Sequence, residues 1–330
     1  MNAAVGEKPC TAFVISIEEK LMKDLNKPKL FFCVGLVASG KSTWAENNKE
    51  KLNAVVHSSD EIRAELNNIN DQSQNDLVFT ILHKRVKEDL LNGKNVIYDS
   101  TGLKRKNRLH LINNILKDIP CEKVCVLFAT PYECCLNNNA SRERKVPEHV
   151  IERMYKNFEV PCKQEGWDDI QIMYWDFEKD GLEFNFEKDL AIWKQISQDS
   201  PHHTLSIGNH MQKAYEYMSE KTDDVLLLLA AYLHDCGKIV TKDYHDSKGN
   251  PCESAHYYQH HCCGSYDSLF YLKGLPNDDV LYVSLLIGLH MNPFLSWDKS
   301  EKTKEKDRRL FGEKVYSDII KLHEADLAAH

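Results

Sequence analysis

The chain has 330 residues, 42% of them hydrophobic, which is enough for two domains that each bury an apolar core. Its formal net charge of −8 argues against a broad basic surface for duplex nucleic acid, but not against a local basic pocket for one nucleic-acid end. Met1 to Pro9 lacks the pattern of a signal peptide, and the longest apolar stretch, 225–233, is too short to span a bilayer. We therefore expect a soluble, cytoplasmic protein that does not bind membranes. The 11 cysteines have no disulfide spacing, and we expect most of them to be buried, reduced thiols.

The N-terminal half alternates short apolar runs with helical patterns. Residues 1–28 are expected to be an extension that contains a short helix, and residues 29–178 to be one domain. Strands are predicted at 30–34, 54–57, 95–98, 123–129 and 170–174. Helices are predicted from Lys41 onward and at 77–92, 106–116 and 147–158. This alternation favours an α/β domain with a parallel sheet and helices on both faces.

The C-terminal half has a different pattern. Residues 179–200 are mixed and charged, and we expect a linker there. Residues 201–330 are predicted to be an all-α domain without strands, with helices at 210–218, 223–233, 257–272, 280–289 and 314–328. The charge run 301–309 favours a solvated loop.

A phosphate-binding loop is the strongest motif in the chain. Residues 35–42 fit G-x-x-x-x-G-K-[ST], with an apolar strand before them and a helix after them. Lys41 is expected to reach the β- and γ-phosphates of ATP or GTP, and Ser42 to hold Mg²⁺. The nucleotide-binding residues are then expected to be Gly35, Ser39, Gly40, Lys41, Ser42 and Thr43.

Two carboxylates follow neighbouring strands. Asp60 comes after the second strand, where a carboxylate faces the phosphate loop and can act as the general base for an attacking hydroxyl; a helix N-cap is the alternative interpretation. Asp99, followed by Thr101, ends the third strand, where a carboxylate holds Mg²⁺ through water; a polar strand end is the alternative.

Basic residues gather in the expected loops at the carboxyl ends of the strands. In an acidic protein this local excess favours phosphate contacts, although any one of these residues can belong to a solvated helix face. The residues are Arg105, Arg108, Arg142, Arg144 and Lys145.

Four segments appear in the order found in one family. They are Gly40-Lys41-Ser42-Thr43-Trp44-Ala45, Ser59-Asp60 with Arg63, Asp99-Ser100-Thr101, and Arg142 to Pro147 followed by Val150-Ile151 and Met154-Tyr155. Together they resemble the phage-type polynucleotide 5′-hydroxyl kinases over residues 29–160. The resemblance implies that Asp60 activates the 5′-hydroxyl, that Arg63 grips a substrate phosphate beside Asp99 and Thr101, and that Arg142 or Arg144 touches the donor phosphates.

The C-terminal half carries histidines and aspartates on or at the ends of its predicted helices. A single histidine is more often a core or surface residue, but histidine nitrogens and carboxylate oxygens from several helices suit a divalent transition metal such as Mn²⁺, Ni²⁺ or Co²⁺. The set is His210, His234, Asp235, His260, His290 and Asp326, with His261 as an alternative to His260.

The order of these residues resembles the HD phosphohydrolase superfamily over residues 201–330. The resemblance implies a first metal held by His210, His234, Asp235 and Asp326. It further implies that His260 and His290 hold a second metal bridged by Asp235, and that Lys238 contacts the substrate phosphate.

The two halves together predict a nucleic-acid end-healing enzyme. The kinase would phosphorylate 5′-hydroxyl ends, RNA being favoured over DNA, and the C-terminal domain would hydrolyse a 2′,3′-cyclic or 3′-phosphate end. A separate ligase would then seal the strand. One alternative is a nucleoside or small-molecule kinase fused to a nucleotidase. Another is a nucleotide-binding regulator with a degenerate HD domain.

Overall fold

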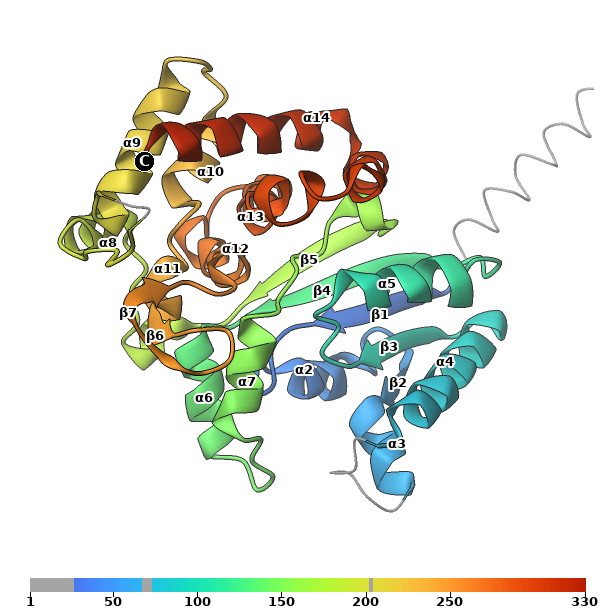
Figure 1. Ribbon diagram of the computed structural model, residues 1–330. Helices are drawn as coiled ribbons and strands as arrows, with labels where there is room; N and C mark the ends of the chain where they lie inside the picture. The colour runs from blue at the N-terminus through green and yellow to red at the C-terminus, as the bar shows by residue number, and fades with distance from the viewer. Residues whose placement is uncertain (1–26, 67–72, 202–203) are drawn as a thin grey trace, which may run out of the picture.

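The computed structural model describes residues 27–66, 73–201 and 204–330. A sheet with its helices lies on one side of the molecule, and a group of helices lies on the other (Figure 1). The expected N-terminal extension falls outside the described residues up to residue 26.

The sheet has five parallel strands, which confirms the α/β prediction. The strands are β1 (Lys29–Val34), β2 (Ala54–Ser58), β3 (Asn95–Asp99), β4 (Glu122–Ala129) and β5 (Asp169–Tyr174). Their order is β2-β3-β1-β4-β5, so the chain crosses from one side of β1 to the other after β3. Ligands of open α/β sheets bind at the carboxyl ends of the strands where the order reverses, here beside β1.

Alternate residues of β1 face two different cores. Phe31 and Cys33 pack toward Trp44 on one face, and Phe32 and Val34 belong to the larger core on the other face. The helices of this half are α2 (Lys41–Asn48), α3 (Ser59–Glu65), α4 (Asn75–Leu91), α5 (Arg105–His110), α6 (Tyr132–Ala140) and α7 (Glu148–Tyr155). A π-helical turn, Leu111–Ile115, and a 3-10 turn, Lys163–Glu165, complete it.

The C-terminal half is mainly helical. Its helices are α8 (Phe186–Trp193), α9 (Ile207–Ser219), α10 (Val225–Leu233), α11 (Lys238–Thr241), α12 (His260–Tyr271), α13 (Asn277–Leu289) and α14 (Glu301–Ala328), with short turns at Phe177–Asp180 and Pro293–Trp297. Two expectations are wrong here. An antiparallel hairpin, β6 (Asp243–His245) with β7 (Pro251–His256), lies in a region expected to have no strand.

The charge run 301–309 is also helical, because it forms the first turns of α14. The Ser300 hydroxyl accepts a hydrogen bond from the Thr303 amide and caps the helix. Lys304 pairs with Glu301 one turn apart at 3.1 Å, so the alternating charges stabilise a helix.

The two halves share one core. Residues 179–200, expected to be a linker, contain α8, whose Leu190 and Trp193 pack in a cluster with Met211 of α9. The large apolar cluster on one face of the sheet continues without a break into α12 and α13, from Leu30 to Leu286. Extensive contact therefore joins the two halves, whereas a free linker would leave few contacts between them.

Candidate functional site

The phosphate-binding loop connects β1 to α2 in a conformation that needs its glycines. A Cβ on Gly35 would lie 2.7 Å from Ser39 Oγ and 3.0 Å from Phe128 Cβ, so a side chain does not fit. Gly40 has φ of 93°, a left-handed conformation that glycine adopts without strain. The Gly35 amide donates a 3.0 Å hydrogen bond to the Thr101 carbonyl, which fastens the loop to the segment after β3.

Lys41 is buried at the start of α2, with its ammonium group turned into the loop. Its Nζ donates to the carbonyl oxygen of Leu36 at 2.5 Å and to that of Gly35 at 3.1 Å. Burial lowers the pKa of Lys41. Nucleotide phosphates can replace these carbonyl contacts, because phosphate oxygens are stronger acceptors for an ammonium group than carbonyl oxygens are.

The predicted Mg²⁺ residues are adjacent. Ser42 Oγ donates to Asp99 Oδ2 at 2.7 Å, which brings the hydroxyl and the carboxylate to one point beside the loop. Burial raises the pKa of Asp99. An oxygen pair of this kind suits Mg²⁺, which accepts few protein ligands and keeps its waters. Thr43 is exposed on the first turn of α2, beside the same point.

Asp60 lies on α3 between two arginines. Arg63 Nη1 is 3.1 Å from Asp60 Oδ1, and Arg144 Nη1 is 3.1 Å from Asp60 Oδ2. Arg63 also donates to Asn75 Oδ1 at 2.6 Å, and its buried Nε has no hydrogen-bond partner among the residues that the structure describes. The carboxylate remains half exposed, at 50% of its side chain, so an acceptor can reach it.

Arg105 and Arg108 correct one expectation, because both pair with Glu165 in the fold. Arg108 is fully buried, with Nη2 2.6 Å from Glu165 Oε1 and Nε 2.7 Å from Oε2. Arg105 Nε contacts the same carboxylate at 3.2 Å. Neither guanidinium faces the phosphate loop. Glu165, 57 residues from Arg108 in sequence, was missed because nothing local to it signals the pairing.

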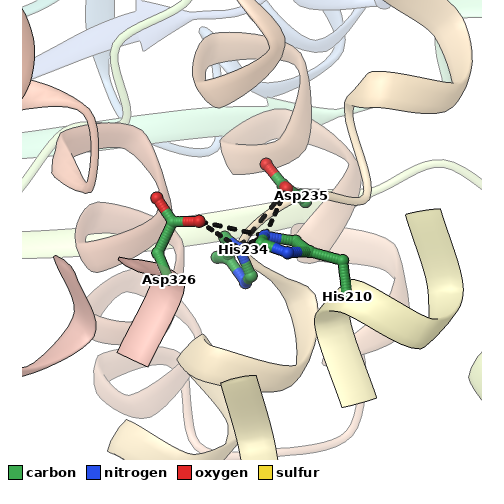
Figure 2. Close-up of side chains that lie close together, drawn as sticks. All are labelled: His210, His234, Asp235 and Asp326. Carbon is green, nitrogen blue, oxygen red and sulfur yellow. Dashed lines mark hydrogen bonds and ion pairs between the residues drawn. The ribbon is translucent and has the colours of Figure 1, made fainter. Parts of the chain in front are cut away.

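In the helical half, four of the expected ligands converge from α9, the end of α10 and α14 (Figure 2). His210 Nε2 is 2.9 Å from Asp326 Oδ1 and 3.2 Å from Asp235 Oδ2. His234 Nε2 is 3.4 Å from the same Asp235 oxygen and 3.3 Å from His210 Nε2. The two nitrogens thus lie between two carboxylates.

The other oxygen of Asp235 faces a second pair of histidines. His260 Nε2 is 3.3 Å from Asp235 Oδ1, and His290 Nε2 is 3.8 Å from it. The two nitrogens are 3.2 Å apart. The structure therefore brings together all six expected ligands as two groups that share Asp235, and it is His260 rather than His261 that belongs to them.

The tautomers of these histidines favour a cation. Each Nδ1 lies within hydrogen-bonding distance of a backbone carbonyl: Ala329 for His210, Ala231 for His234, Tyr257 for His260 and Ile287 for His290. If each Nδ1 donates there, the Nε2 atoms face one another and the carboxylates of Asp235 and Asp326. Burial favours the neutral form, but Asp235 and Asp326 raise the pKa of His210 and raise that of His234 to about 10, so a metal would displace a proton from His234. Burial lowers the pKa of His260 to about 4 and that of His290 to about 3, so both are neutral near pH 7. A metal ion resolves the repulsion between the lone pairs of their Nε2 atoms.

Lys238 is buried against this cluster. Its Nζ lies 2.6 Å from Asp235 Oδ2 and donates to Gln198 Oε1 at 2.8 Å, and its ammonium group lies over the ring of Tyr257. Gln198 and Tyr257 had not been predicted, since neither belongs to a recognisable motif. His202 and His203 lie outside the described residues.

Comparisons with known proteins bear on the N-terminal half. Residues 30–161 match the model of a family described as an AAA domain. The chain is 29% identical over 176 residues to the L-seryl-tRNA(Sec) kinase of Methanococcus maripaludis, an alignment that covers 49% of this chain and 68% of that protein. The N-terminal half of this chain is a P-loop kinase domain.

Two solved structures resemble the P-loop kinase domain more distantly. A chain of the Pnkp1/Rnl/Hen1 RNA repair complex is 22% identical with a TM-score of 0.34, covering 38% of this chain and 42% of that one. A provisionally assigned kinase from Chloroflexus aurantiacus is 14% identical with a TM-score of 0.40, covering 51% of this chain and 95% of that one. Within the part of the chain that the structure describes, no helix has the length and apolar character needed to cross a membrane.

Proposed function

We propose that the chain heals broken nucleic-acid ends: it phosphorylates 5′-hydroxyl ends with ATP and hydrolyses a 2′,3′-cyclic or 3′-phosphate end in the helical domain. One observation carries this proposal. A single chain holds a P-loop kinase site and, in its helical half, six buried or nearly buried histidines and aspartates in two groups that share Asp235. Breakage that leaves a 5′-hydroxyl and a phosphorylated 3′ end requires both reactions before a ligase can act.

In the proposed kinase reaction, Asp60 takes the proton of the 5′-hydroxyl. The hydroxyl oxygen attacks the γ-phosphorus of ATP, and ADP leaves. Arg63 and Arg144, which already bracket Asp60, are placed to bind the phosphates of the acceptor strand. Ser42 and Asp99 fit Mg²⁺, which supplies neutralisation of the phosphate charge when bound. The relative from Methanococcus maripaludis is named as a kinase of L-seryl-tRNA(Sec), a substrate that contains RNA, which supports an RNA acceptor here.

In the helical domain, His210, His234, Asp235 and Asp326 would hold one divalent metal, and Asp235 with His260 and His290 a second. Such a pair supplies a hydroxide near neutral pH and neutralises a phosphate oxygen. Lys238 keeps the bridging carboxylate charged through its 2.6 Å contact, and the expected contact of Lys238 with the substrate phosphate remains part of the proposal. We propose domain limits of 29–178 for the kinase and 201–330 for the HD phosphohydrolase, with α8 of residues 179–200 packed against the helical half.

The deciding experiment presents purified protein with γ-labelled ATP and an RNA oligomer that has a 5′-hydroxyl. The expected result is transfer of label to the 5′ end, and its loss in Asp60→Asn, which still binds ATP because the phosphate loop is untouched. A DNA oligomer and free nucleosides serve as competing acceptors. Equal phosphorylation of nucleosides and oligomers would replace the proposal by a nucleoside kinase.

The second half of the experiment uses the same oligomer with a 2′,3′-cyclic phosphate or a 3′-phosphate end, after loading with Mn²⁺, Co²⁺ or Ni²⁺. The expected result is release or opening of the terminal phosphate. Failure with all three metals and both ends would contradict the hydrolase proposal and favour a regulator that binds nucleotide.

A further inference from the structure

Tyr266 connects the helical domain to the kinase domain at one buried point. It lies in the middle of α12 and is fully buried, and its hydroxyl donates a 2.6 Å hydrogen bond to the Thr130 carbonyl directly after β4. Edge-on packing against Phe158 and Tyr155, with ring centroids 4.8 and 5.5 Å away, holds the tyrosine ring in place. This packing restricts the rotation of the ring, so the hydroxyl stays directed at the Thr130 carbonyl.

Thr130 in turn holds the phosphate-binding loop. Its side-chain hydroxyl donates to the Ser39 carbonyl at 3.0 Å, and Asn138 Nδ2 supports the preceding residue through the Ala38 carbonyl at 3.2 Å. Ala38 has φ of 62°, a conformation that costs free energy in a residue other than glycine and persists where neighbours hold it. The Tyr266 hydroxyl is therefore connected to the phosphate-binding loop through a single residue, Thr130.

We propose that Tyr266 is a positioning residue for the nucleotide site, so that the helical domain completes the kinase. This inference rests on the proposed kinase function. Without the tyrosine hydroxyl, the one remaining donor to the buried Thr130 carbonyl among the described residues is the Cys135 thiol, a weak donor 3.6 Å away, and the loop loses its anchor on the helical side. Ser39 can then shift, and the amides that receive the β- and γ-phosphates lose their fixed geometry.

The start of α12 is also held in place by its neighbours. His260 begins the helix, and a Cβ on Gly237 would lie 2.1 Å from the His260 carbonyl and 2.4 Å from the Gly264 amide. The first turn of α12 is thus fixed against the segment that carries Asp235. Six residues of helix, about 9 Å, separate His260 from Tyr266, so one rigid element touches both sites.

The test compares two variants that each remove one hydroxyl from the same helix. Tyr266→Phe removes the bond to Thr130, whereas the control Tyr271→Phe removes a 2.9 Å bond to Asp189 of α8, within the helical half. Calorimetric titration with ATP is expected to show about three- to tenfold weaker binding for Tyr266→Phe only, the loss of one neutral hydrogen bond. The KM for ATP should rise while the KM for the RNA acceptor stays constant.

A second pair of variants, at Thr130, controls for a general loss of stability. Thr130→Val removes the hydroxyl that holds Ser39, and Thr130→Ser retains it, so weaker ATP binding is expected in the first variant only. Equal ATP affinity in Tyr266→Phe and Tyr271→Phe, at similar melting temperatures, would overturn the inference. Absence of ATP binding by the unaltered protein would overturn the kinase proposal itself, and this inference with it.

Discussion

At the scale of single residues, the structure separates Arg142 and Arg144, two arginines of the loop between α6 and α7 that the sequence left as alternatives. Arg144 contacts the candidate base Asp60 on the acceptor side. We assign Arg142 to the donor side as a hypothesis, because its charge acts on Lys41 and Asp99: burial and, to a smaller extent, Arg142 lower the pKa of Lys41, and Arg142 opposes the burial that raises the pKa of Asp99. The two variants should therefore differ in steady-state kinetics: Arg142→Ala should raise the KM for ATP, and Arg144→Ala should raise the KM for the RNA end.

The expected size of each effect is about ten- to a hundredfold, because a charge-assisted hydrogen bond contributes about 1.5–3 kcal/mol. Lys145→Ala is the control, since this exposed lysine lies in the same loop and, among the described residues, pairs with neither Asp60 nor Asp99. An identical change in both KM values for both arginine variants would remove the distinction between a donor and an acceptor arginine.

Asp235 is the residue on which the metal centre depends. Its two carboxylate oxygens face different pairs of histidines, so Asp235→Ala should lower the content of both metals and abolish phosphohydrolase activity. Metal analysis together with both assays measures this. Asp318→Ala is the control, because Asp318 is also buried but binds Lys314 and Tyr282 far from the cluster.

The kinase kcat of Asp235→Ala at saturating ATP should stay close to that of the unaltered protein, because no ligand of the cluster contacts the phosphate loop. Retention of metal by a folded Asp235→Ala variant would contradict the shared-ligand arrangement.

At the scale of elements, α14 contains a glycine that the helix requires. Gly312 has φ of 84° and ψ of 168° between two helical segments, a region of backbone conformation that is open almost only to glycine. Gly312→Ala should therefore lower the free energy of unfolding by about 1–3 kcal/mol, although the new Cβ would meet nothing within 4 Å. Metal affinity should fall as well, because the second segment of α14 carries Asp326.

Denaturant unfolding and metal titration of Gly312→Ala test this, with Gly93→Ala as the control. Gly93 also has positive φ and open surroundings, but it follows α4 and carries no ligand. The control should lose about 1 kcal/mol of stability and keep its metal affinity. An unchanged metal affinity in Gly312→Ala would show that the bend does not position Asp326.

The elements also show where sequence patterns have physical limits. The buried strands were predictable because a parallel strand is apolar along its whole length, as in residues 30–34. The hairpin was not, because all three residues of β6 are exposed, and β7 begins with proline and buries only Ala255. The charge run at the start of α14 predicts a loop, because a pattern of charges does not reveal that Ser300 caps a helix there.

The candidate sites show the same limits. The phosphate loop and the six histidines and aspartates were predictable because each binding group must be a particular residue type at a fixed place. Arg108 with Glu165, and Tyr266 with Thr130, were not predictable, because such pairs depend on how distant segments pack.

At the scale of the whole molecule, the shared core bears on how the chain unfolds. The sequence favours two domains and an open linker, but α8 is packed into the helical half and one apolar cluster extends from β1 to α13. The buried bond between Tyr155 and Asp267, 2.5 Å long, and the Tyr266 bond to Thr130 cross the same boundary. Separating the halves would expose this apolar surface to water, at a cost of about 25 cal/mol for each Å².

We therefore expect heat to unfold both halves in one cooperative transition. Circular dichroism, tryptophan fluorescence and scanning calorimetry should report the same midpoint. A divalent metal that binds the helical half and an ATP analogue that binds the phosphate loop should each move this whole transition upward, since a ligand of the native state stabilises everything that unfolds with its site. Two resolved transitions, of which only one responds to metal, would show that the halves unfold independently and that the boundary near residue 179 separates two autonomous domains.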